Sequence, residues 1–203
     1  MTSHSLRGIA ACIALLTPLL GHAALVNGNF EANTLAAGRF AILPTLTGWQ
    51  ADTLGVELRR DVAGTAQAGQ KFVELDTTGN SAIWQDLATT VGEHYRLSGW
   101  YSPRAGVAAD SNDIQVLWNG SLLTTLGGSG IGQSNNVWRQ FNLSVTGTGV
   151  DRLRFAAAGK SDSLGGSLDN IALNTATVPE PASLVLVLVA FGAAGLVSRQ
   201  RAR

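Results

Sequence analysis

The chain has 203 residues, with 14 basic and 14 acidic side chains and a formal net charge of zero at pH 7. Its single cysteine, Cys12, lies in the predicted export signal described below, so the exported protein can form neither a disulfide nor a thiolate metal site. No cluster of Lys and Arg resembles the basic patch of a nucleic-acid-binding protein, so nucleic acid is excluded as an expected partner.

The N-terminus has the parts of a secretory signal peptide. Arg7 supplies positive charge, residues 8–21 are apolar, and Gly21 and Ala23 place small side chains at the two positions that signal peptidase reads. We therefore expect residues 1–23 to be a signal peptide that signal peptidase removes after Ala23.

Histidine is nearly absent from the remaining chain. His4 and His22 leave with the signal, so His94 alone is left and a multi-histidine zinc site is excluded. A Ser-His-Asp triad would have to use His94, which lies in a segment with the composition of a turn. We interpret His94 as a solvated turn residue, and we predict no catalytic residue.

Residues 24–177 are predicted to form one all-β domain. Short segments of alternating apolar and polar residues are separated by Gly, Asn, Asp and Ser, which is typical of antiparallel sheets. Asn119-Gly120 predicts a two-residue hairpin turn, since both residues tolerate positive φ. This spacing of strands favours a jelly-roll β-sandwich. The predicted strands are Val56–Arg60, Lys71–Asp76, Ala82–Ala88, Tyr95–Ser102, Ile114–Trp118, Ser121–Leu126, Trp138–Thr146, Arg152–Ala157 and Leu168–Leu173.

The strands Ala82–Ala88 and Tyr95–Ser102 are predicted to pair as a hairpin. In the register that pairs their apolar residues, Trp84 lies opposite Trp100 on the more polar face. Indole rings can stack on the C–H faces of sugars while charged neighbours bind the hydroxyls. The alternative is an aromatic pair that only stabilises the sheet, by about 0.5–1.5 kcal/mol. The predicted ligand-binding residues on this face are Trp84, Trp100, Asp86 and Arg96.

Three segments of the domain resemble galactose-binding-like domains and many carbohydrate-binding modules. They are the opening Leu25-Val-Asn-Gly-Asn-Phe-Glu31 followed by Gly48-Trp49, the run from Gly69 to Arg104, and the closing run from Asp162 to Ile171. The resemblance implies a jelly-roll sandwich, but this fold carries many functions and does not by itself imply a ligand.

The same resemblance implies one structural calcium ion between the opening segment and the last strand. Carried over by motif, its carboxylate ligands would be Glu31 in Asn-Phe-Glu and Asp169 in Leu-Asp-Asn, with backbone carbonyls completing the shell. The alternative is that Glu31 and Asp169 only accept hydrogen bonds from loop amides where the chain ends meet. No other cofactor is expected.

The C-terminal segment, residues 178–203, contains a Pro-Glu-Pro triplet, an apolar run and a basic tail. The run 182–198 is at the short limit for a transmembrane helix, and the arginines favour the cytoplasmic side. This order resembles the PEP-CTERM sorting signal of Gram-negative bacteria, in which an exosortase recognises the triplet and cuts nearby. The alternative is a plain single-pass anchor. The triplet is Pro179, Glu180 and Pro181, and the basic tail is Arg199, Arg201 and Arg203.

These features predict an exported protein with no enzymatic activity. It would be anchored in the inner membrane before exosortase processing and would then reach the cell surface or extracellular matrix, with exopolysaccharide as the expected ligand. A first alternative is a structural protein of a biofilm or floc matrix without a defined ligand. A polysaccharide hydrolase is the third hypothesis, and no carboxylate pair in the sequence singles itself out for it.

Overall fold

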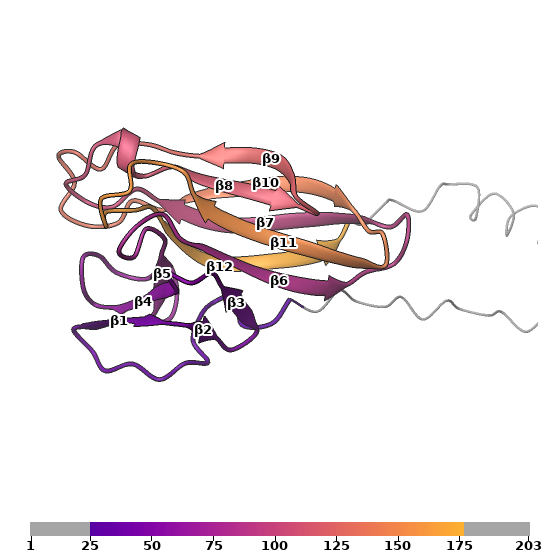
Figure 1. The fold of residues 1–203 in the computed structure, drawn as a ribbon, viewed down its shortest axis with the longest axis horizontal. Helices are drawn as coiled ribbons and strands as arrows, with labels where there is room; N and C mark the ends of the chain where they lie inside the picture. Colours follow the sequence, from indigo (N-terminus) through magenta and orange to yellow (C-terminus); the bar gives the residue numbers. More distant parts are fainter. Residues whose placement is uncertain (1–24, 177–203) are drawn as a thin grey trace, which may run out of the picture.

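The computed structural model describes residues 25–176, which form two stacked antiparallel sheets of six strands each (Figure 1). This arrangement confirms the predicted all-β sandwich. The predicted signal peptide and predicted anchor helix, the Pro-Glu-Pro triplet and the arginine tail lie outside the described residues. Between residues 25 and 176, no helix has the length and hydropathy needed to cross a membrane.

The first sheet has the strand order β1-β4-β5-β12-β7-β10, and the second has the order β2-β3-β6-β11-β8-β9. We call them sheet A and sheet B. Sheet A comprises β1 (Arg39–Leu43), β4 (Val56–Arg60), β5 (Phe72–Glu74), β12 (Ser167–Thr175), β7 (His94–Ser102) and β10 (Arg139–Thr146). Sheet B comprises β2 (Thr45–Leu46), β3 (Trp49–Ala51), β6 (Ala82–Ala88), β11 (Val150–Ala157), β8 (Ile114–Trp118) and β9 (Ser121–Leu126).

All nine predicted strands are present, four of them with the predicted bounds. The predicted hairpin turn is also confirmed, because β8 pairs with β9 and both Asn119 (φ 51°) and Gly120 (φ 80°) have positive φ. The short strands β1, β2 and β3 were not predicted. They have only two to five residues, too few for alternation to stand out.

The predicted hairpin between the segments 82–88 and 95–102 is wrong. Strand β6 pairs with β3 and β11 in sheet B, whereas β7 pairs with β10 and β12 in sheet A. The alternation had been interpreted correctly, since Ile83 and Leu97 both point into the core. Alternation shows which side chains point inward, but it does not show whether two strands lie side by side or face each other across the core.

The core lies between the two sheets and is rich in aromatic rings. Trp49 is fully buried, with ring centroids 5.8 Å from Phe30 and 6.1 Å from Phe155. Phe141 of sheet A meets Phe155 of sheet B edge-on at 6.2 Å, so aromatic contacts join the two layers. The inward positions of both sheets are therefore used for packing, and polar chemistry is left to their outer faces and loops.

Candidate functional site

A loop of residues 61–71, which we call the strap, lies against the outer face of sheet A. Asp169 of β12 faces outward and accepts hydrogen bonds from the strap amides of Gln67 (2.8 Å) and Ala68 (3.3 Å). The indole N–H of Trp138 donates to the Thr65 carbonyl at 3.0 Å. Through these contacts the strap covers outward-facing side chains of sheet A, and Asp169 is fully buried as a result.

The junction predicted to hold calcium is held instead by hydrogen bonds and an ion pair. Glu31 Oε1 accepts from the amides of Gln70 (2.6 Å) and Lys71 (2.7 Å), and Glu31 Oε2 lies 2.8 Å from the Lys71 ammonium. In the described part of the chain, no group of three or more His, Cys, Asp or Glu side chains could hold a metal ion. The Glu31 side chain does not fit the role of a calcium ligand here, because both of its carboxylate oxygens already bind the Lys71 ammonium or the amides of Gln70 and Lys71. This arrangement supports the alternative of bonds to loop amides, and calcium stays a prediction.

The carboxyl groups of this junction have shifted pKa values. Burial raises the pKa of Asp169 to about 6, although three backbone amides partly oppose this shift. At Glu31, burial raises the pKa, but the hydrogen bonds from Lys71 and Gln70 outweigh it and hold the pKa below its usual range. Both carboxyl groups are therefore mostly ionised at neutral pH, and Asp169 is the first to take up a proton as the pH falls toward 6.

A cavity of about 290 Å³ opens where the strap meets β1 and β4. This volume lies just below the usual range for small-molecule sites, about 300–1,000 Å³. One side of the cavity is apolar and accessible, since Phe40 is 57% and Ile42 is 42% exposed. The full lining is Phe40, Ile42, Glu57, Arg59, Val62, Ala63, Thr77, Arg104 and Ser163. An apolar wall beside a charged floor is typical of a site for a small polar ligand.

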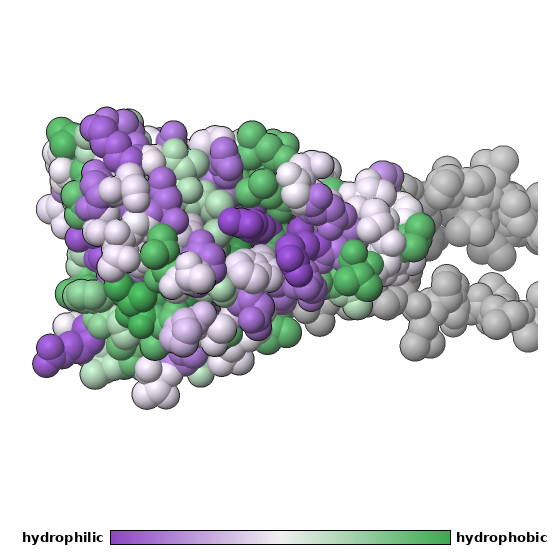
Figure 2. All heavy atoms as spheres, viewed as in Figure 1, coloured by the Kyte–Doolittle hydropathy of each residue, from purple (hydrophilic) through white to green (hydrophobic). Residues whose placement is uncertain are grey.

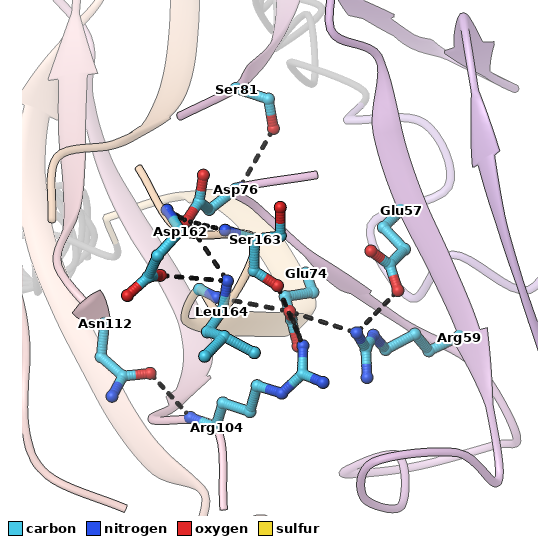
Figure 3. A network of polar contacts seen from close by, with 11 residues as sticks. Glu57, Arg59, Glu74, Asp76, Ser81, Arg104, Asn112, Asp162, Ser163 and Leu164 are labelled. Atoms are coloured by element: carbon cyan, nitrogen blue, oxygen red, sulfur yellow. Dashed lines mark hydrogen bonds and ion pairs between the residues drawn. The ribbon is translucent and has the colours of Figure 1, made fainter. Parts of the chain in front are cut away.

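An ionic cluster forms the floor of the cavity (Figure 3). Glu57, Arg59 and Arg104 line the cavity, and Glu74 pairs with both arginines without lining it. Glu57 of β4 and Glu74 of β5 are directly opposite each other in the register. Arg59 Nη2 lies 2.7 Å from Glu57 Oε1 and 3.2 Å from Glu74 Oε1. Arg104 Nη1, from the loop after β7, lies 2.6 Å from the same Glu74 oxygen. Glu74 thus joins two guanidinium groups that come from different parts of the chain.

Burial has the largest effect on the pKa values of the two carboxyl groups in this cluster. It raises the pKa of Glu74 to about 7, although Arg59 and Arg104 oppose the shift. Burial also raises the pKa of Glu57, again against the attraction of Arg59. Among the side chains of this cluster, three buried atoms have no hydrogen-bond partner: Glu57 Oε1, Arg59 Nε and Glu74 Oε2. The Glu57–Arg59 contact is therefore an ion pair without hydrogen-bond geometry, and the floor retains unused hydrogen-bonding capacity.

Two neighbouring loops hold the cluster in place. Asp76 Oδ2 accepts hydrogen bonds from the amides of Asp162, Ser163 and Leu164 (Figure 3). These bonds fix the loop that ends at Gly165, whose amide donates to Glu74 Oε1 at 3.3 Å. A Cβ atom at position 165 would collide with the Leu75 carbonyl, so glycine is required there. Asn112 Oδ1 accepts from the Arg104 amide at 2.8 Å and so fixes the start of that loop.

The backbone of the strap is strained beside the cavity. Asp61 and Ala63 have φ values of 56° and 53°, in the left-handed region that costs most L-residues about 1–2 kcal/mol. Ala63 and its neighbour Val62 both line the cavity. Strained residues of this kind cluster at functional sites, which agrees with the chemistry of the floor.

The predicted sugar platform is split between the two outer faces of the sandwich. Trp84 and Asp86 lie on sheet B, where the Arg152 guanidinium makes a two-bond contact with Asp86 at 2.6 and 2.8 Å. The guanidinium carbons of Arg152 and Arg154 lie 5.6 and 6.0 Å from the centre of the Trp84 ring. Hydrophilic side chains gather over β6 and β11 on this face (Figure 2).

The other two predicted residues lie on sheet A, away from Trp84. Trp100 is directly opposite Asp169 in the register of β7 and β12. Arg96 borders a separate hollow of about 520 Å³ near Ala176, the last described residue. The four residues therefore do not form one binding surface, and the prediction that Trp84 and Trp100 stand together is wrong.

Sequence reasoning did not single out the ionic cluster. Arg104 was named only as the end of a segment that resembles other galactose-binding-like domains, with no role in a site. The available signal was that Glu57 and Arg59 alternate with Val56 and Leu58 in one predicted strand, and that Glu74 lies between Val73 and Leu75 in another. Charged residues at such positions normally face solvent, so the pattern cannot reveal that a distant loop covers them.

The comparison with known families bears on the C-terminal segment. Residues 177–202 match the family described as the PEP-CTERM protein-sorting motif. This segment is a PEP-CTERM sorting motif. Its presence indicates a protein that is exported and held at the membrane before it is processed, as the sequence predicted.

Comparisons of the domain show its fold. It is 34% identical over 155 residues to the multifunctional-autoprocessing repeats-in-toxin protein of Vibrio cholerae, and the match covers 72% of this chain but 3% of the toxin. The K2 cleaved adhesin domain of Lys-gingipain gives a TM-score of 0.53 at 15% identity, covering 74% of this chain and 97% of that one. A carbohydrate-binding module, TmCBM61 in complex with β-1,4-galactotriose, gives 0.48 at 17% identity over 76% of this chain and 99% of the module. The chain spans about 3% of the curated relatives it matches, so it shares one domain with them.

Proposed function

We propose that this protein is exported, sorted by an exosortase and retained at the surface or in the extracellular matrix of a Gram-negative bacterium, where its β-sandwich binds polysaccharide without altering it. The sorting motif supports the route. The observation that supports binding is the cavity, in which exposed Phe40 borders a floor formed by Glu57, Arg59 and Arg104. A sugar ring offers both an apolar face and hydroxyl groups, which matches these two walls.

The same geometry argues against hydrolysis at this cavity. Glycoside hydrolysis uses two carboxyl groups on either side of the scissile bond. Here Glu57 and Glu74 are both paired with Arg59, the Glu74 side chain is only 1% exposed, and Glu74 does not line the cavity. His94 is exposed beside Thr146 and is remote from the cluster in the sheet register. We therefore propose recognition of the polymer rather than turnover.

Binding can be tested with a glycan array and matched variants. Phe40→Ala removes an exposed ring and leaves the core intact, so we expect sugar affinity to fall by about tenfold or more. Val91→Ala removes a 75% exposed apolar side chain that does not line the cavity and should leave affinity unchanged. If no glycan binds and deletion of the gene still weakens biofilm or floc cohesion, a structural matrix role without a defined ligand replaces this proposal.

Sorting can be tested separately. Replacing Pro179, Glu180 and Pro181 with alanines should leave a slightly larger species in the inner membrane, detected by fractionation and immunoblotting. Ser183→Ala keeps the triplet and serves as the control. Equal release of wild type and the triple variant would contradict exosortase processing and favour a plain anchor.

A further inference from the structure

The charges of the ionic cluster balance at pH values above the raised pKa values of Glu57 and Glu74. Glu57 and Glu74 supply two carboxyl groups, and Arg59 and Arg104 supply two guanidinium groups. Each of the four takes part in at least one ion pair within the cluster. A ligand that brings a net charge would therefore enter a site whose opposite charges are already paired.

We infer that the cavity recognises an uncharged sugar unit through its hydroxyl groups and discriminates against acidic sugars. This inference rests on the proposed function, because it names the class of polysaccharide that the same cavity would bind. Its basis is the balanced cluster together with the apolar wall of Phe40 and Ile42.

Hydroxyl groups match the unused capacity of the floor. Glu57 Oε1 is a buried acceptor without a hydrogen-bond donor, and Arg59 Nε is a buried donor without an acceptor. Both side chains line the cavity and each is 5% exposed. A hydroxyl group can donate and accept at once, so neighbouring hydroxyls of one sugar ring complement a wall that contains both a donor and an acceptor. Both atoms are covered in the free protein, so binding would require the Glu57 and Arg59 side chains to turn toward the sugar.

A carboxylate on the ligand would not match this floor. It can only accept hydrogen bonds, and it would place a third carboxyl group beside Glu57 and Glu74. The two guanidinium groups are held by Glu74, whose Oε1 accepts from Arg104 at 2.6 Å and from Arg59 at 3.2 Å. An acidic sugar would have to break these contacts or bind together with a proton, and both cost binding free energy.

The apolar wall of Phe40 and Ile42 favours a sugar ring for a reason that does not depend on charge. Phe40 is 57% exposed, and the Arg59 guanidinium carbon lies 5.7 Å from its ring centre. The ring therefore adjoins the cluster and can contact the C–H face of a sugar whose hydroxyls reach the floor. Ile42, next along the same face of β1, extends this apolar surface.

The test compares matched pairs of oligosaccharides that differ at one position. The pairs are oligomers of galactose and galacturonate, of glucose and glucuronate, and of mannose and mannuronate, matched in length. Each is titrated into the full-length protein by calorimetry at pH 8, where Glu74 is ionised. We expect at least one neutral member to bind at least about tenfold more tightly than its acidic partner, with little change in affinity between low and high salt.

A variant pair sharpens the result. Glu57→Gln keeps the shape of the side chain and removes its charge, so the preference for the neutral member should fall severalfold, mainly because the acidic member gains. Glu93→Gln changes an acidic residue that does not line the cavity and should leave the preference unchanged. Circular dichroism melts establish that each variant is folded, and if Glu57→Gln does not fold, the wild-type preference decides alone.

The possible binding results distinguish failure of the neutral-sugar preference from failure of polysaccharide binding itself. Tighter binding of an acidic partner by the wild type, weakened by salt, would overturn this inference and leave polysaccharide binding intact. Failure of every neutral and acidic oligomer to bind would remove the proposed function and this inference with it.

Discussion

The outer faces of the two sheets carry similar residues in very different surroundings. On sheet B, Asp86 and Arg152 form an ion pair whose side chains are 49% and 51% exposed. On sheet A, Glu74 and Arg59 form a pair whose side chains are 1% and 5% exposed. The pKa of Asp86 is lowered by the hydrogen bond from Arg152, whereas burial raises the pKa of Glu74 to about 7.

The strap and its neighbouring loops account for this difference. An exposed ion pair is stabilised only weakly, because water solvates the separated charges almost as well as the pair does. A buried pair has lost that water, so removing one partner leaves the other charge unpaired in a poorly solvated place. The same residue types therefore form a solvated ion pair on the outer face of sheet B and a buried ionic cluster on the outer face of sheet A.

The largest expected effect contrasts these two pairs directly. Glu74→Ala should lower the free energy of unfolding by about 3–5 kcal/mol at pH 8, because Arg59 loses a buried partner. Asp86→Ala removes the partner of Arg152 on the open face and should change stability only slightly. Urea denaturation of both variants measures the contrast. Similar losses for the two would show that the strap does not isolate the cluster from water.

The pH dependence of stability should also differ between the faces. Glu74, which faces Arg59, Arg104 and Glu57, has a folded pKa of about 7 against an ordinary value of 4.5. Because the folded state binds the Glu74 proton more tightly than the unfolded state, this group contributes its full stabilisation below pH 4.5. The contribution is lost as the pH rises to about 7. Asp169 acts in the same direction between 3.8 and about 6. Asp86, with a lowered pKa, contributes stability only as the pH rises through its ordinary value of 3.8.

We therefore expect the free energy of unfolding to fall as the pH is raised from about 4.5 to about 7. Denaturation at a series of pH values measures this slope. Glu74→Gln should flatten it, while Asp86→Asn should leave it unchanged. A wild-type stability that rises steadily across this range would contradict the raised pKa of Glu74.

A smaller effect concerns the fastening of the strap. Lys71→Gln should lower the free energy of unfolding by about 1–3 kcal/mol, because Glu31 loses its ammonium partner. A chelator should leave the melting temperature of the wild type unchanged, since amides and Lys71 use the Glu31 oxygens. A clear drop in melting temperature with chelator, reversed by added calcium, would restore the structural calcium ion predicted from the resemblance.

Much of the fold could be predicted from the sequence because β-strands carry a local signature. Alternation places Ile83 and Leu97 inward, and Asn119-Gly120 encodes its own turn. The pairing of strands is not local in this sense. The connection between β6 and β7 passes from one sheet to the other, and residues 89–93 contain nothing that distinguishes this crossing from a hairpin.

The candidate site was harder to predict than the fold. Glu57, Glu74 and Arg104 come from three separate segments, and their burial depends on a loop that Asp169 fastens from the far end of the chain. Trp84 and Trp100 were predicted to form a sugar-binding platform because they are large, aromatic and close in sequence. Proximity in sequence favours a platform only if the two strands are neighbours, and here they are not.

The last strand also determines how the domain is presented. Residue 167, at the start of β12, is level with Glu74 and the cavity, whereas residue 175 pairs with Tyr95 at the opposite end, from which the chain continues to the sorting motif (Figure 1). Nine residues of extended strand separate these levels by about 26 Å. The cavity therefore lies at the end of the sandwich opposite the point where the chain leaves for the sorting motif, so tethering through that motif would not cover it.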